Sequence, residues 1–275
     1  MYRFLLFPNF KKKAVTFSYD DGHVNDVKLV EILNKYGLKG TFNINSSCIL
    51  NPAKNRLSLK QAKELYKSGG HEVAVHGARH LSLSDMDMAT ATNEILSDRI
   101  ALEKGFGKII KGMAYANGDI TNEYLTSVKA SGIKYARIVL SRRNFDLPTD
   151  WLRLSSTCHH NDPELFNLTE KFLNEPDREY YWSRRQRLFY IWGHASELDY
   201  NDGWERIEKF CSLVGNNPEI WACTNMELYD YIKAYQSLEF DVENKFCFNP
   251  TSTTIYMEYF DKLLEIKPGK TVKLK

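Results

Sequence analysis

Two aspartates that are neighbours in the sequence, Asp20 and Asp21, follow directly on an apolar run in the stretch AVTFSYDDGHVND. Asp-Gly is a common turn dipeptide, so such a pair can simply mark a solvated turn. Two adjacent carboxylates at the end of a buried strand also repel each other, and a cation bound between them offsets that repulsion. Which interpretation holds depends on the residues that stand at the other strand ends.

A histidine pair, His76 and His80, has the spacing His-x-x-x-His in the stretch HEVAVHGARH. This spacing places two imidazoles one helical turn or one tight loop apart, so that both can reach one ion. Two imidazoles and one carboxylate leave coordination positions open and suit Zn²⁺ or another divalent first-row metal. With two aspartates nearby, one carboxylate can bind the metal while the other takes a proton from metal-bound water. The histidine pair alone is a weak signal, but with the aspartate pair it indicates a metal site.

Strand patterns alternate with helix patterns along most of the chain. Strands are predicted at 12–19, 39–45, 71–76, 111–116, 133–138, 187–194 and 219–224. Helices are predicted at 23–37, 58–70, 84–107, 120–132, 204–215 and 225–235, with Ser58 and Ser84 as N-caps of the second and third. Strand–helix units repeated in this way imply parallel strands joined by crossover helices, so the sequence predicts an α/β fold, a (β/α) barrel of eight units or fewer.

The alternation of strand and helix patterns ends after residue 237. Residues 238–275 alternate apolar and polar side chains at period two, with Asn249-Pro250 and Pro268-Gly269 as turns. We therefore predict a barrel domain at 1–237 and a small antiparallel β extension at 238–275.

Composition narrows the class of protein. The chain has 275 residues, 43% of them hydrophobic, and a net charge of +2, which gives no basic field for nucleic acid. The five cysteines contain no CxxC pair and indicate neither a zinc ribbon nor a disulfide framework. The sequence contains no apolar stretch long enough to span a membrane and no signal-peptide pattern. As it stands it predicts a cytoplasmic protein, or a secreted one if a leader is missing, and it does not indicate an oligomeric state.

Parallel α/β folds collect their catalytic groups at the carboxyl ends of the strands. Four predicted strand ends carry polar groups here: the aspartate pair, the histidine pair, Asn117-Gly118, and His194 in FYIWGH. We expect all four groups on one face of the barrel.

The ordered segments FSYDDG, GHEVAVHGARH, MAYANGD and FYIWGH resemble the polysaccharide deacetylases of the NodB-homology type, carbohydrate esterase family 4, over roughly residues 12–235. The resemblance implies a distorted (β/α) barrel. It also implies a general base at Asp20, metal ligands at Asp21, His76 and His80, a general acid at His194, and a backbone N–H for the oxyanion at Asn117.

Two family features differ in this chain. The third motif has Ala116 where the family usually has proline, and the arginine that often precedes it and orients the base is missing. The fourth motif, Asp-x-x-Asp-Trp in typical members, is matched loosely by FDLPTDW, in which Trp151 would form an apolar wall of the site.

The resemblance implies a metal-dependent hydrolase that removes acetyl groups from N- or O-acetylated sugars of a polysaccharide or oligosaccharide. The metal would be zinc, with cobalt or manganese as alternatives. Tyr19, Trp192, Trp151 and Glu197 are predicted to line the substrate site, and Trp192 to stack on a sugar ring because it shares a strand face with His194.

Two alternatives stay open: a hydrolase of a small non-glycan amide, and a carbohydrate-binding protein with impaired catalysis. His159 and His160 adjoin each other, and because adjacent residues rarely converge on one ion we predict no second metal site there.

Overall fold

The computed structural model describes residues 3–118, 120–176 and 185–274. Its centre is a nine-stranded parallel sheet with the order β7-β6-β5-β4-β3-β2-β9-β8, in which β10 also pairs with β2. The strands are β2 (Lys13–Asp20), β3 (Gly40–Ile44), β4 (Glu72–Val75), β5 (Gly112–Ala114), β6 (Tyr135–Ser141), β7 (Leu154–Ser156), β8 (Cys158–His159), β9 (Arg187–His194) and β10 (Ile220–Ala222). No helix in these described ranges is long and apolar enough to cross a membrane.

One extended segment closes the sheet into a ring. Its first part, β7, pairs with β6, and its second part, β8, pairs with β9. Between them the backbone N–H of Thr157 donates to the carbonyl of Tyr190 at 2.8 Å, so the segment passes from one neighbour to the other without a break. The predicted distorted (β/α) barrel is confirmed.

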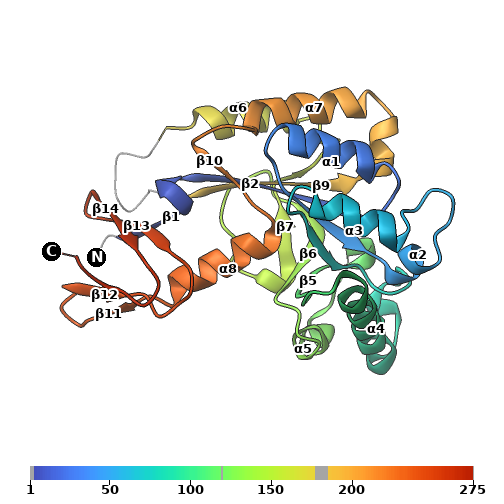
Figure 1. The fold of residues 1–275 in the computed structure, drawn as a ribbon, viewed down its shortest axis with the longest axis horizontal. Coiled ribbons are helices and arrows are strands. Elements are labelled where there is room, and N and C mark those ends of the chain that lie inside the picture. Colours follow the sequence, from blue (N-terminus) through green and yellow to red (C-terminus); the bar gives the residue numbers. More distant parts are fainter. Residues whose placement is uncertain (1–2, 119, 177–184, 275) are drawn as a thin grey trace.

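Helices cover the outside of the barrel (Figure 1). They are α1 (Asp26–Lys35), α2 (Ser46–Leu50), α3 (Leu59–Lys67), α4 (Met88–Phe106), α5 (Leu125–Ala130), α6 (Leu165–Asn174), α7 (Gly203–Val214) and α8 (Asn225–Gln236). Short 3-10 turns are η1 (Pro8–Phe10), η2 (Leu83–Asp85), η3 (Ala116–Gly118), η4 (Asn122–Tyr124), η5 (Trp151–Arg153) and η7 (Ala195–Asp199).

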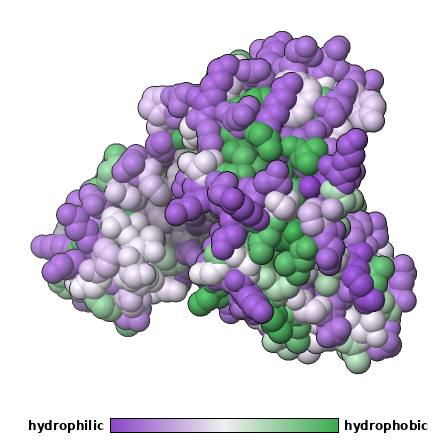
Figure 2. Space-filling model, turned by 45° about the vertical axis from the view of Figure 1, so that its right-hand side comes forward, coloured by the Kyte–Doolittle hydropathy of each residue, from purple (hydrophilic) through white to green (hydrophobic). Residues whose placement is uncertain are grey.

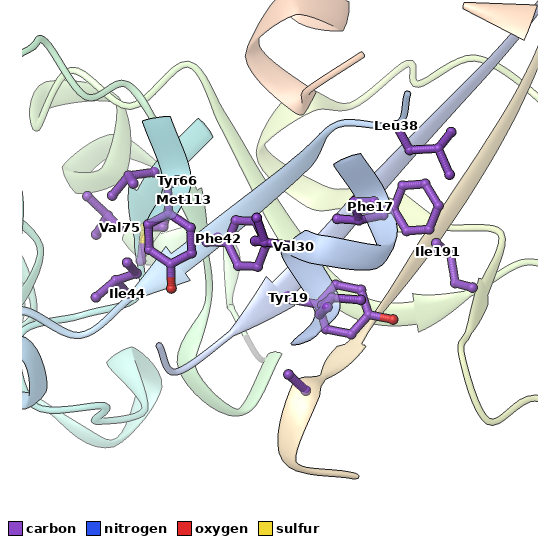
Figure 3. Close-up of a cluster of buried hydrophobic side chains, with 14 of the residues drawn as sticks. Phe17, Tyr19, Val30, Leu38, Phe42, Ile44, Tyr66, Val75, Met113 and Ile191 are labelled. Carbon is purple, nitrogen blue, oxygen red and sulfur yellow. The ribbon is translucent and has the colours of Figure 1, made fainter. Parts of the chain in front are cut away.

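The main hydrophobic core lies between the strands and these helices. Outward side chains of β2, β3 and β9, such as Phe17, Phe42 and Ile191, are buried there with residues of the covering helices (Figure 3). A strand alternates its side chains between two faces, so the residues between these apolar ones point into the barrel.

The barrel interior is polar. Thr16, Ser18 and Asp20 alternate with the outward apolar residues of β2, and all three are buried. Lower in the barrel, Glu72 accepts hydrogen bonds from the Tyr135 hydroxyl at 2.6 Å and the Thr41 hydroxyl at 2.9 Å. Buried polar groups of this kind stay buried because they are hydrogen-bonded to one another.

Helix α8 closes the end of the barrel away from the carboxyl ends of the strands. At its first residue, the side chain of Asn225 accepts from the Thr16 hydroxyl at 2.9 Å and donates to the Tyr190 hydroxyl at 2.7 Å. At the opposite end of the barrel, β2, β4 and β9 end and loops follow them.

Additional antiparallel strands follow α8, as predicted. β11 (Glu239–Phe240), β12 (Phe246–Phe248) and β15 (Thr271–Lys273) form one sheet, and β13 (Ile255–Tyr259) and β14 (Lys262–Ile266) belong to another. The edge of that second sheet is β1 (Arg3–Leu6), which pairs with β13 and was not anticipated from the sequence. The boundary at residue 237 stays a prediction.

The structure corrects one predicted cap and adds elements. Ser58 caps α3 through a capping box with Gln61, as predicted. The cap of α4 is Asp87 instead of Ser84, because the carboxylate of Asp87 accepts from the backbone N–H groups of Ala89 and Thr90, each at 3.0 Å. The segments β7, β8 and α6 were not predicted.

Candidate active site

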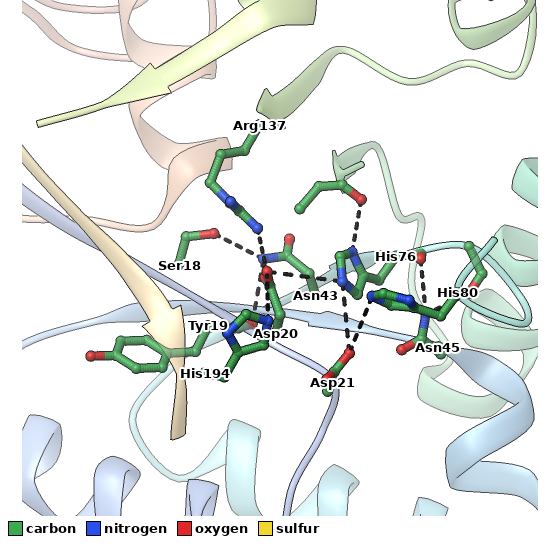
Figure 4. A network of polar contacts seen from close by, with 12 residues as sticks. Ser18, Tyr19, Asp20, Asp21, Asn43, Asn45, His76, His80, Arg137 and His194 are labelled. Atoms are coloured by element: carbon green, nitrogen blue, oxygen red, sulfur yellow. Dashed lines mark hydrogen bonds and ion pairs between the residues drawn. The ribbon is translucent and has the colours of Figure 1, made fainter. Parts of the chain in front are cut away.

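The polar residues of three strand ends meet at one rim of the barrel (Figure 4). Asp20 and Asp21 come from the end of β2, His76 and His80 from the loop after β4, and His194 from the end of β9. The carboxylate oxygen Oδ1 of Asp21 lies 3.7 Å from Nε2 of His76 and 3.7 Å from Nε2 of His80. Three ligand atoms at these separations can bind one ion between them.

His76 has the protonation pattern of a metal ligand. Its Nδ1 donates to the carbonyl of Ala114 at 2.9 Å, which leaves the lone pair on Nε2. That Nε2 is buried and has no hydrogen-bond partner among the described residues. Burial lowers the pKa of His76 despite the raising effect of Asp20, so the imidazole is neutral. A buried acceptor without a partner, aimed at a carboxylate, fits a divalent cation.

Two of these three residues hold a left-handed backbone. Asp21 has φ 79° and His80 has φ 61°, a region that costs non-glycine residues roughly 1–2 kcal/mol. Asp21 is fixed there by the bond from its N–H to the carbonyl of Asn43 at 2.9 Å, and its Oδ2 lies 3.5 Å from Nη2 of Arg56. Strain of this kind is typical of functional sites.

Helix α4 supports the histidine loop with two buried acids, Glu94 and Asp98. Asp98 accepts from the backbone N–H groups of His76 at 3.0 Å and Ser46 at 2.7 Å, and Glu94 accepts from Nε of Arg79 at 3.1 Å. Burial raises the pKa of Asp98 to about 7. The sequence analysis missed both acids, although their i, i+4 spacing on the core face of a helix is a readable signal.

Asp20 is buried inside the barrel, 2% exposed, and paired with Arg137 of β6. Its Oδ1 also accepts from Nδ2 of Asn43 at 2.8 Å. Burial raises the pKa of Asp20, but Arg137, His76, His194 and Asn43 together outweigh burial and the pKa lies below its ordinary value. Arg137 therefore supplies the cation that keeps Asp20 charged, reaching it from β6.

His194 is held by a carboxylate three residues ahead. Its Nδ1 lies 3.2 Å from Oε1 of Glu197, and its backbone N–H donates to Oε2 at 3.2 Å. The other ring nitrogen, Nε2, lies 3.9 Å from Oδ2 of Asp20. Burial lowers the pKa of His194, but Glu197 and Asp20 raise it further than burial lowers it. The raised pKa favours the protonated ring, whose Nδ1 faces Glu197 and whose Nε2 faces Asp20.

The other predicted site residues are placed differently from one another. Tyr19 points out of the barrel, is fully buried, and reaches Nδ1 of His160 with its hydroxyl at 3.2 Å. Trp192 faces the interior with the Arg137 guanidinium 4.4 Å from its ring centroid, so one face of its ring is covered. Trp151 precedes β7 and packs edge-on against Tyr229 of α8, at the closed end of the barrel and not at the site.

Asn117 lies at the end of β5, in η3, with φ 59°. Its side chain donates to the Ser82 hydroxyl at 2.6 Å. Among the hydrogen bonds recorded for the described residues, none uses the backbone N–H of Asn117, which leaves this donor available to a ligand.

His159 and His160 approach one carboxylate, while the prediction that these two adjacent histidines do not share an ion stays a prediction. Nε2 of His159 and Nε2 of His160 lie 3.1 Å and 3.2 Å from the same atom, Oε2 of Glu197. Strand β8 ends at His159, so the two side chains are not held on opposite faces of one strand.

Residues 8–136 match the family model described as polysaccharide deacetylase. The matched range contains Asp20, Asp21, His76, His80 and Asn117, and it ends one residue before Arg137. No curated protein matches the chain significantly.

Three solved structures are similar to the chain. The first is the Streptococcus pyogenes deacetylase PplD in complex with acetate. Its alignment covers 45% of this chain and 55% of PplD, at 22% identity and a TM-score of 0.43. Peptidoglycan deacetylase PdaC from Bacillus subtilis aligns over 84% of this chain and 96% of its own, at 16% identity and a TM-score of 0.54. BA3943 from Bacillus anthracis, a CE4 family pseudoenzyme, aligns over 82% of this chain and 68% of its own, at 15% identity and a TM-score of 0.52. The predicted resemblance is confirmed, and the latter two structures share the fold.

The ligand set can be separated from the buried aspartate by metal analysis. We expect Asp20→Asn to bind as much zinc as the parent protein, because Asp21 and the two histidines remain, and His80→Ala and His76→Ala to bind one ion fewer per chain. The measurement is zinc content after reloading and desalting, with His23→Gln as a histidine control outside the ligand set. A folded Asp20→Asn protein that loses as much zinc as His80→Ala would contradict the assignment.

Proposed function

We propose that the protein is a metal-dependent hydrolase that removes acetyl groups from a carbohydrate. Two findings support this function: residues 8–136 match the polysaccharide deacetylase family, and the barrel has the fold of solved CE4 proteins. The observation that carries the proposal is the convergence of three ligand atoms beside a buried, ionised aspartate and a histidine whose pKa is raised. The ligands are Asp21, His76 and His80, and the metal is zinc, with cobalt or manganese as substitutes.

The metal would supply Lewis acidity and a water of lowered pKa. Asp20 suits the role of general base because it stays ionised inside the barrel and both of its oxygens are fixed, Oδ1 by Asn43 and Oδ2 by Arg137. A base held in one orientation beside the ligand set takes the proton of an attacking water without first having to move.

His194 suits the role of general acid. Because Glu197 holds Nδ1, the transferable proton is on Nε2, the nitrogen that faces Asp20. An amine leaves poorly unless it is protonated, so the acid gives this proton to the leaving amine, or to a leaving hydroxyl in an ester. The backbone N–H of Asn117 would stabilise the developing oxyanion, a contribution that is usually large.

The rim of the site suits a carbohydrate chain better than a small enclosed amide. The side chains of Asp21, His80 and His194 are 22%, 35% and 29% exposed, although they belong to the proposed chemistry. A cavity of about 720 Å³ is lined by other residues, among them Arg142, Ser156 and Tyr235. An open site accepts a segment of polymer, whereas a small amide is usually enclosed.

Exposed apolar side chains follow several strand ends. Leu50 comes after β3, Leu81 after β4 and Tyr200 after β9, and they are 51%, 38% and 70% exposed. Figure 2, in which the right-hand side of Figure 1 comes forward, shows apolar patches within a mostly hydrophilic surface. Such side chains can pack against the apolar faces of sugar rings.

The first test is acetate release from a panel of N-acetylated and O-acetylated sugars and oligosaccharides. The protein would be stripped with chelator and then reloaded with zinc, cobalt or manganese. We expect metal-dependent release from the reloaded protein and none from Asp20→Asn. If protein with stoichiometric metal releases no acetate from any member of the panel, the result would instead favour a non-glycan amide substrate or a binding role without catalysis.

The support of the base by Arg137 gives a second prediction. Arg137→Met keeps the length of the side chain and removes its charge, so Asp20 loses a charge-assisted hydrogen bond of roughly 1.5–3 kcal/mol. We expect kcat to fall roughly 10- to 100-fold with zinc content unchanged. The control is Arg153→Met, a surface arginine at the other end of the barrel. A kcat equal to that of the parent protein would contradict a positioning role.

The pairing of Glu197 with His194 gives a third prediction. Glu197 raises the pKa of His194, so Glu197→Gln, which keeps an acceptor oxygen but no charge, lowers that pKa. His194 then loses its proton at a lower pH, and the alkaline limb of the kcat/KM profile moves to lower pH. Glu205→Gln, an exposed carboxylate on α7, is the control. An alkaline limb that does not move in Glu197→Gln would exclude His194 as the acid.

A further inference from the structure

We propose that His159, His194 and Glu197 form a second divalent-metal site, separate from the site of Asp21, His76 and His80, and that an ion bound there removes His194 from its role as acid. The inhibitory part rests on the proposed function, whereas the binding part does not. This cluster stands on the turn that follows β9 and on the end of β8.

The separations between the three ligand atoms suit one ion. Nε2 of His159 lies 3.1 Å from Oε2 of Glu197, and Nδ1 of His194 lies 3.2 Å from Oε1 of Glu197. One ligand atom from each of the three residues lies within 4.8 Å of the other two. Zinc–ligand bonds of about 2.0–2.1 Å in a tetrahedron place neighbouring ligand atoms roughly 3.3 Å apart, so small side-chain movements complete the site.

The cluster also has the donor types and the access that a metal needs. Two imidazoles and one carboxylate are the same donor set as at the first site, and they suit zinc. The side chains of His159, His194 and Glu197 are 25%, 29% and 38% exposed, so an ion can enter and water can fill the remaining positions. The two nitrogens of the His194 ring point to different places, Nε2 toward Asp20 and Nδ1 toward Glu197.

Metal binding exchanges protons for the ion at two nitrogens. The backbone N–H of Asn161 donates to Nδ1 of His159 at 3.2 Å, so the proton of the neutral ring is on Nε2, facing Glu197. A metal at Nε2 moves this proton to Nδ1, and the Asn161 N–H, which is exposed, exchanges its bond for one to water. The backbone N–H of His194 still donates to Oε2 of Glu197, and Nε2 of His160 still lies beside the same oxygen.

An ion on Nδ1 of His194 blocks the acid. The ring then has only the N–H on Nε2, which it cannot give up as the imidazolium does. General acid catalysis contributes roughly 10²–10⁴-fold to a rate, so a filled second site should lower activity by roughly 100-fold or more. About one equivalent of metal would therefore activate the protein, and metal in excess of one equivalent would inhibit it.

Zinc binding is measured first, without substrate, by calorimetry and by zinc analysis after equilibrium dialysis. We expect two zinc ions per parent chain, one in His159→Gln, and two in the control His23→Gln. The variant His80→Ala, which loses the first site, should still bind one, and His80→Ala/His159→Gln none. A single ion in the parent protein, or two in a folded His159→Gln protein, would overturn the proposal.

Acetate release is then followed while free zinc is raised above one equivalent. We expect activity in the parent protein and in His23→Gln to rise and then fall, and activity in His159→Gln to rise to a plateau. If two ions bind but excess zinc does not inhibit an active parent protein, the inhibitory part is wrong. If no protein releases acetate, the proposed function fails, while the binding measurements still decide the second site.

Discussion

The ion pair between Asp20 and Arg137 is the interaction on which the candidate site depends. Asp20 is 2% exposed and Arg137 1% exposed, and a carboxylate buried that deeply would be protonated if it stood alone. Arg137 projects from β6 across the interior to β2, and the two strands are not neighbours in the ring. Only a long side chain spans that gap, and the Trp192 ring packs over the guanidinium on the way. The barrel therefore provides both the burial that fixes the aspartate and the cation that keeps it charged.

The two neighbouring aspartates differ because the strand ends between them. Asp20 is the last residue of β2 and points inward by the alternation of the strand. Asp21 would point into the outer core if the strand continued, but its φ of 79° turns the chain and brings its carboxylate to the rim beside the two histidines. His80 reaches the same point by the same backbone device, φ 61°. The left-handed residues cost some stability. The bond from the N–H of Asp21 to the carbonyl of Asn43 holds Asp21 in place, and Asp98 fixes the backbone of His76 at the start of the loop that carries His80.

The convergence of Asp20, Asp21, His76, His80 and His194 could be predicted from the sequence, since the carboxyl ends of parallel strands share one face. Arg137 could not, because an arginine in the segment IKYARI is recognisable as an inward residue only once the closed ring defines an interior. Glu94 and Asp98 were missed because their role depends on which helix face meets the histidine loop. Trp151 was assigned to the site by a loose motif, but the strand that follows it starts at Leu154, so Trp151 belongs to the opposite end.

Asp20 and His194, the proposed base and acid, are supported over different distances along the chain. The bond between Arg137 and Asp20 joins residues 117 positions apart and forms only when the barrel closes through β7 and β8. The bond between Glu197 and His194 joins residues three positions apart within one 3-10 turn. A local turn therefore fixes the orientation of the His194 ring, whereas the charge of Asp20 depends on long-range closure. Substitutions that loosen the closing segment should consequently affect the ionisation of Asp20 before they affect His194, even when they lie far from the rim.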